Sequence, residues 1–152
     1  MTVLAIDVHG DDLSLFSAFT CLRDEPLVVV VNQTVPTDEI DEAMSELGLQ
    51  WRGWDQRPHS GVTHVIAPAY HPEGHLEHNV AAGLAADWRV PITFYATYAP
   101  RGQRTRTDNE VPYEPWMVAR KLRALSCFES QIEQESTRPW FTYLLDIREW
   151  YA

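Results

Sequence analysis

Two short polar clusters hold the residues of this sequence that are best suited to chemistry. The first is HGDD, residues 9–12, which ends an apolar run, and the second is GHLEH, residues 74–78. A catalytic zinc usually takes three protein ligands and leaves a fourth position for water. His9, Asp12 and one later histidine would supply two nitrogens and one oxygen for such a site.

The spacing inside HGDD divides the work between its residues. His9 and Asp12 are three residues apart, so a turn that leads into a helix can direct both at one ion. Asp11 must point elsewhere, and it could act as a general base on a metal-bound water whose pKa the metal lowers to roughly 7. For this motif alone, a polar turn followed by a helix N-cap is about as good an interpretation, because aspartate is favoured at N-caps.

GHLEH supplies the groups that HGDD lacks. His75 and His78 are also three residues apart, at the start of a predicted helix, so they share a face. One of them can bind the metal while the other faces the substrate, and Glu77 could hold one imidazole in its working tautomer. A histidine pair is a weak signal in a chain with six histidines, but two such clusters after two strands are a stronger one.

The hydrophobic pattern predicts the scaffold that brings these clusters together. Near-continuous apolar runs, typical of strands covered on both faces, occupy residues 4–8, 27–32, 64–70 and 92–98. Helical patterns occupy residues 12–22, 37–47, 76–88 and 115–135. This alternation predicts one α/β domain over residues 1–152, a Rossmann-like three-layer sandwich around a mostly parallel sheet.

Two segments leave alternatives open. Residues 51–54, WRGW, are a short strand or a loop. The aromatic tail, residues 140–152, packs on the body as a strand or helix, or forms the surface of a homo-oligomer.

The parallel sheet predicts a common location for the polar loops, because sites in open parallel sheets form outside the carboxyl ends of the strands. Each of the four predicted strands is followed by such a loop, at residues 9–12, 32–34, 71–78 and 100–107. We therefore expect all four loops at one edge of the sheet.

Composition excludes several classes of function. The formal net charge is −10, which repels a phosphate backbone, so broad nucleic-acid binding is not expected. The longest apolar runs are strand-length, too short to span a membrane. The chain enters a strand pattern without the zones of a signal peptide, and we expect a cytoplasmic protein whose two cysteines are buried and reduced.

The two clusters resemble the signatures of a known family. HGDD is similar to the HPDD signature of the LmbE-like or PIG-L deacetylases, with Gly10 in place of proline, and GHLEH is similar to that family's HPDH. Two further stretches match the family's E-x-x-x-A-x-x-x-L-G and K-x-x-A-x-x-x-x-x-S-Q patterns. Their residues are Glu39, Ala43 and Leu47-Gly48 for the first, and Lys121, Ala124 and Ser130-Gln131 for the second. The matches run in the family's order from residue 3 to about 131.

The resemblance implies a zinc-dependent hydrolase that removes an acetyl group from an N-acetylated amino sugar or a related conjugate. It implies three zinc ligands, His9, Asp12 and His78, and makes Asp11 the general base. His75, oriented by Glu77, would stabilise the oxyanion or protonate the departing amine.

The sequence departs from the family where the substrate would bind. Pro36 stands where the family usually has an arginine that helps to hold the sugar, and Leu13 replaces an acidic residue. The loop after the fourth predicted strand holds three arginines, Arg101, Arg104 and Arg106. They could bind an anionic group of a small N-acetylated substrate, or the loop is simply solvated. Tyr70 could line a sugar-binding mouth.

Two classes other than an enzyme remain open. One is a small-molecule or nucleotide-binding module on the same fold, although no glycine-rich phosphate fingerprint follows the first strand. The other is a non-catalytic interaction protein that retains the residues of the site.

Overall fold

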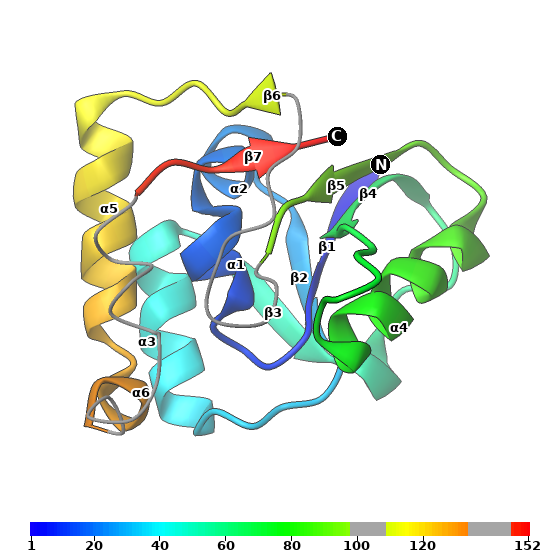
Figure 1. The fold of residues 1–152 in the computed structure, drawn as a ribbon. Coiled ribbons are helices and arrows are strands. Elements are labelled where there is room, and N and C mark those ends of the chain that lie inside the picture. The colour runs from blue at the N-terminus through cyan, green and yellow to red at the C-terminus, as the bar shows by residue number, and fades with distance from the viewer. Residues whose placement is uncertain (98–108, 134–146) are drawn as a thin grey trace.

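The computed structural model describes residues 1–97, 109–133 and 147–152. These residues form an α/β fold with a mixed, mostly parallel sheet (Figure 1). Its seven strands are β1 (Thr2–Asp7), β2 (Leu27–Val30), β3 (Gln50–Gly53), β4 (Val62–Pro68), β5 (Ile92–Tyr95), β6 (Asn109–Glu110) and β7 (Trp150–Tyr151). The α-helices of the described residues are α1 (Asp12–Phe16), α2 (Ala18–Asp24), α3 (Thr37–Leu47), α4 (Leu76–Leu84), α5 (Pro115–Ser126) and α6 (Glu129–Glu133). Two 3₁₀ turns, Trp54–Gln56 and Ala85–Trp88, complete the elements.

The strand order is β3-β2-β1-β4-β5-β7-β6. The first five strands are parallel, while β7 runs antiparallel to both β5 and β6. The four predicted apolar runs are therefore confirmed as parallel strands, and the open question about residues 51–54 is answered by β3, which pairs with β2. Because β1, β2 and β4 point the same way, the loops after them begin at one edge of the sheet.

Apolar side chains cover both faces of the sheet. Successive residues of β1 alternate between the two faces, with Leu4 and Ile6 in one core and Ala5 in the other. Helices α1, α2, α3 and α5 close the Ala5 side, whereas α4 and the turn after it close the other (Figure 1). Burial on both faces explains why the strands are near-continuous apolar runs and do not alternate with polar residues.

Two predicted helices are each broken once, and each break exposes a backbone N–H that a carboxylate from a distant part of the chain accepts. Residues 12–22 divide at Ser17, and the Phe19 N–H at the start of α2 donates to Glu149 at 2.9 Å. Residues 115–135 divide after α5, and the Ser130 N–H of α6 donates to Glu39 at 2.8 Å. A carboxylate at a helix N-terminus is favourable, and this compensates for the interrupted helix.

The C-terminal segment, residues 147–152, is part of the sheet and of the core. Main-chain hydrogen bonds join Phe94 to Ala152 in both directions, and the N–H of Val111 donates to the main-chain carbonyl of Glu149. The buried carboxylate of Glu149 lies 2.7 Å from the equally buried Lys121 Nζ, which also donates to the carbonyl of Leu15 at 2.9 Å. The described part of the predicted tail, residues 147–152, thus packs on the body and contains the strand β7, which is one of the predicted alternatives. Residues 140–146 of that tail lie outside the described residues.

The structure also bears on the predictions about membranes and cysteines. No helix among the described ranges has the length and apolarity needed to cross a membrane. Cys21 is buried and Cys127 is partly buried, and both are free thiols.

Candidate metal centre

The loop after β1 turns around a buried carboxylate. Asp7 ends the strand, and its two oxygens accept the backbone N–H groups of Gly10 at 2.7 Å and Leu13 at 3.2 Å. Burial, together with the nearby carboxylates of Asp12 and Asp11, raises the pKa of Asp7 against the lowering effect of these hydrogen bonds. Gly10 has a φ of 114°, which proline cannot adopt. The glycine in HGDD is therefore required by the conformation of this loop.

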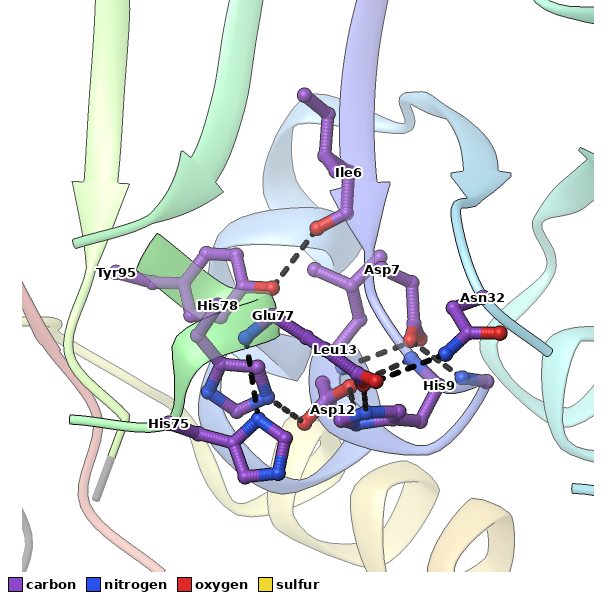
Figure 2. A network of polar contacts seen from close by, with 11 residues as sticks. Ile6, Asp7, His9, Asp12, Leu13, Asn32, His75, Glu77, His78 and Tyr95 are labelled. Atoms are coloured by element: carbon purple, nitrogen blue, oxygen red, sulfur yellow. Dashed lines mark hydrogen bonds and ion pairs between the residues drawn. The ribbon is translucent and has the colours of Figure 1, made fainter. Parts of the chain in front are cut away.

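Three predicted ligands meet where the loop enters α1. One donor atom each from His9, Asp12 and His78 can be chosen so that all lie within 4.8 Å of one another (Figure 2). The two carboxylate oxygens of Asp12 face different imidazoles: Oδ1 lies 2.9 Å from His78 Nε2, and Oδ2 lies 3.2 Å from His9 Nδ1. Asp12 is 3% exposed and His78 is 1% exposed, so two of the three residues of the group are buried.

The electrostatics of this group keep its carboxylate charged. Burial alone would raise the pKa of Asp12, but the interactions with His78 and His9 outweigh it and hold that pKa far below its ordinary value. Burial would likewise lower the pKa of His9, yet Asp12 and Glu77 together raise it to about 9. Without a metal, the ring of His9 is therefore protonated on both nitrogens and positively charged near neutral pH. A bound divalent cation would replace this positive charge.

The start of α4 places a third imidazole next to the other two. His75 is the N-cap of α4, and its Nδ1 accepts the backbone N–H of Glu77 at 3.3 Å. Its ring centroid lies 5.2 Å from that of His9 and 5.3 Å from that of His78. Burial and the neighbouring imidazoles lower the pKa of His75, which favours a neutral ring.

The carboxylate of Glu77 forms its hydrogen bonds with residues other than His75. It contacts Nε2 of His9 and accepts a hydrogen bond from Asn32 Nδ2 at 3.0 Å (Figure 2). The bond to His9 is the main reason that the pKa of Glu77 lies below its ordinary value. The side chain of Glu77 thus contacts the imidazole of His9, whereas the resemblance implied His75, and the backbone N–H of Glu77 donates to His75.

The other predicted residues lie in different settings. Asp11 is buried and occupies the N-cap position of α1, as the alternative interpretation of HGDD has it, but its side chain makes no capping hydrogen bond. Tyr70 follows β4 and is 67% exposed. The three arginines of the predicted anion clamp, Arg101, Arg104 and Arg106, fall outside the described residues.

Three residues of the site had no role in the sequence-based prediction. Asp7 shapes the loop, Asn32 holds Glu77, and the hydroxyl of Tyr95 donates to the carbonyl of Ile6 at 2.8 Å, directly behind the site. Asp7 carried a usable signal, because it is the one charged residue in the buried run LAIDV. A buried carboxylate needs hydrogen-bond donors, and a loop that turns around it provides them.

A scan against protein-family models gave no match, and searches of the curated proteins and of the solved structures also gave none.

The three donors fit a divalent transition metal. Two imidazole nitrogens and one carboxylate oxygen are the ligands of many catalytic zinc sites, and the same set accepts iron or cobalt. The short distances between donors, and a carboxylate that stays ionised while buried, are what a metal requires. A second group, formed by His9, His75 and Glu77, shares His9 with the first and is more exposed.

Proposed function

We propose that this protein is a metal-dependent hydrolase that removes an acetyl group from a small N-acetylated amine, an amino sugar or a related conjugate. The observation that carries the proposal is the group of His9, Asp12 and His78, of which the last two are buried, with a second buried aspartate, Asp11, next to it in the sequence. The reaction and substrate class come from the resemblance of HGDD and GHLEH to the signatures of the LmbE-like deacetylases. We also propose that the fold of this protein has the Rossmann-like, three-layer arrangement that the resemblance implies.

The residues divide the hydrolysis of an amide into recognisable tasks. A divalent ion at His9, Asp12 and His78 would supply a Lewis acid and a source of activated water. Asp11 adjoins a ligand in sequence and takes the proton that water loses on attacking the carbonyl. That proton passes to the leaving nitrogen, so the products are acetate and a free amine.

His75 is suited to stabilise the oxyanion. Its Nδ1 accepts the Glu77 N–H, so a neutral ring carries its proton on Nε2. A neutral imidazole with a fixed N–H is a hydrogen-bond donor for developing negative charge. Of the two roles considered for His75, the geometry therefore favours donation to the oxyanion over protonation of the amine.

The weaker stretches of the resemblance support the proposal through their positions. Glu39 of the first stretch accepts both the N–H and the hydroxyl of Ser130 from the second, the latter at 2.7 Å. Lys121, also from the second stretch, forms the buried ion pair with Glu149 and bonds the end of α1. These residues hold α3, α5 and α6 in place around the helix that carries Asp12.

Metal content and acetate release test the proposal together. Protein purified without a histidine tag should contain about one zinc per chain, and His78→Ala should lose it. Wild type should release acetate from a panel of N-acetylated sugars and nucleosides. Asp11→Asn should keep the metal and lose about 100-fold or more in rate. A wild-type protein that binds no metal would refute the hydrolase and leave a non-catalytic binding module as the better interpretation.

The anion clamp is a separate part of the proposal. Arg101, Arg104 and Arg106 would bind a phosphate or carboxylate on the substrate. Replacing Arg104 and Arg106 by alanine should raise KM for anionic substrates and leave neutral ones unaffected. Equal turnover of anionic substrates by the variant and the wild type would rule the clamp out.

A further inference from the structure

The two ring nitrogens of His9 face different carboxylates. Nδ1 lies 3.2 Å from Oδ2 of Asp12, within the proposed metal group, whereas Nε2 contacts the carboxylate of Glu77 on the opposite side of the ring (Figure 2). A neutral imidazole carries one proton, so one nitrogen is a donor and the other offers a lone pair. The partner of the outer nitrogen therefore decides which nitrogen can bind a metal.

Glu77 is itself held in place. Its Oε1 accepts from Asn32 Nδ2 at 3.0 Å, and its other oxygen contacts His9. The side chain of Glu77 is 41% exposed and that of His9 is 15% exposed, so the contact spans the boundary between solvent and the buried group. Asn32 follows β2, His9 follows β1 and Glu77 lies in the first turn of α4, so this chain of contacts joins three elements at the edge of the sheet.

From these contacts we propose that Glu77 is a positioning residue of the metal site. It accepts the proton of His9 Nε2 and thereby presents Nδ1 of His9 as the ligand atom, while Asn32 fixes the Glu77 carboxylate. A carboxylate behind a metal-bound histidine sets the tautomer and the orientation of the ring. The inference rests on the metal site of the proposed function and is independent of which amide is hydrolysed.

The length of the side chain agrees with this role. The signature that GHLEH resembles has aspartate at this position, and glutamate is longer by one methylene. While its backbone N–H is bonded to His75, the longer side chain of Glu77 reaches His9.

A second metal ion held by His9, His75 and Glu77 is the competing interpretation. It would require both nitrogens of His9 to bind metals at once, and so a ring stripped of its last proton. It would also displace Glu77 as the acceptor of the Nε2 proton. The two interpretations predict different metal stoichiometries.

Metal affinity separates these possibilities. Zn²⁺ titrations in competition with a chromophoric chelator would compare wild type with Glu77→Gln, Asn32→Ala and the double variant. Glu77→Gln should weaken binding by about 10–100-fold. Asn32→Ala should weaken it less, and the double variant should be no worse than Glu77→Gln because both changes affect one chain of contacts.

A matched control isolates the charge effect. Glu73→Gln removes the same charge from an exposed residue in the loop before α4, and it should change the affinity by less than about two-fold, as expected for a screened surface charge. Thermal unfolding in chelator would show that each variant is folded. The visible spectrum of the Co²⁺ form should change in Glu77→Gln and stay unchanged in Glu73→Gln, which a merely structural role of Glu77 would not produce.

The possible failures are distinguishable. Wild type that binds no Zn²⁺ would overturn both the proposed function and this inference. One ion in wild type, bound with equal affinity in Glu77→Gln, would overturn only the inference. Two ions in wild type, of which Glu77→Gln loses the weaker, would make Glu77 a ligand and overturn its role as a positioning residue.

Discussion

Replacing Gly10 with alanine should be among the more damaging small changes in this protein. Gly10 has a φ of 114°, where an L side chain is strained, and a Cβ added there would lie 2.6 Å from Cδ1 and 3.0 Å from Cγ1 of the buried Ile40. The backbone strain costs about 1–3 kcal/mol. Forcing a methyl group into a packed core costs about 1–3 kcal/mol more. We therefore expect Gly10→Ala to lose about 2–6 kcal/mol of unfolding free energy.

Two further variants separate these contributions. Gly61 also has a positive φ, 75°, but nothing lies within 4 Å of its added Cβ, so Gly61→Ala reports mainly the backbone cost, about 1 kcal/mol. Ile40→Val deletes Cδ1, the atom in the closest contact, at a cost of about 0.5–1.5 kcal/mol by itself. In the Gly10→Ala background, Ile40→Val should relieve the contact, so the double variant should lose less than the sum of the two single losses.

Urea unfolding followed by tryptophan fluorescence, in chelator at one pH, measures all four variants on one scale. Equal losses in Gly10→Ala and Gly61→Ala would show that the close approach to Ile40 costs nothing, which would refute the reasoning. Strict additivity of Gly10→Ala and Ile40→Val would do the same. Because Gly10 lies between His9 and the aspartates, Gly10→Ala should also weaken metal binding, and Gly61→Ala should not.

Three other predictions concern groups around the site. Lys121→Met should cost about 3–5 kcal/mol of unfolding free energy in urea because it leaves the buried charge of Glu149 unpaired. Adding Glu149→Met should restore much of this loss, and a double variant as unstable as the sum of the two single variants would contradict the prediction. In chelator, the raised pKa of His9 stabilises the folded state, and the full effect is present at pH values below the ordinary pKa of 6.5. This stabilisation should be lost as the pH rises through about 9, and the unfolding free energy of His9→Gln should lack this dependence on pH. Tyr95→Phe removes the hydrogen bond to Ile6 and should cost about 1–2 kcal/mol; unchanged urea midpoints would argue against a contribution from that bond.

The sequence predicted the parallel part of the fold well because burial on both faces leaves long apolar runs, as in residues 4–8 and 27–32, where β1 and β2 lie. It could not predict the breaks in the helices. Ser17 and Cys127 lie within continuous helical patterns, and the N–H groups that follow the breaks bond to Glu149 and Glu39 from distant parts of the chain. Local periodicity carries no information about such partners.

For strand β7 the sequence left the choice between strand, helix and oligomer surface open, for a different reason. It has only two residues, Trp150 and Tyr151, and its pairing with β5 and β6 is antiparallel. A strand of this length has no period that a sequence pattern could display. The sequence therefore indicated that the tail was packed, without indicating where.

The candidate site, like the fold, could be predicted from the sequence only in part. Residue types and spacing pointed to His9, Asp12 and one of the two histidines of GHLEH, because metal ligands are of few kinds and must lie at strand ends that meet. The choice of His78 over His75 came from the family resemblance, and the structure brings His78 together with His9 and Asp12. The partner of Glu77 could not be selected in this way. His75 and His9 are both imidazoles, and only the three-dimensional path of the side chain determines which one its carboxylate reaches.

The position of β7 between β5 and β6 imposes an order on folding during synthesis. The edge of β5 is complete once Tyr95 has been made, but its partner in the sheet follows only after residues 96–149. At ~5–20 residues per second, the ribosome needs several seconds to add that stretch. Throughout this interval the apolar β5 has an open edge to which another nascent chain can pair. Slow synthesis or pausing within residues 96–149 should therefore lower the yield of folded protein more than pausing earlier in the chain.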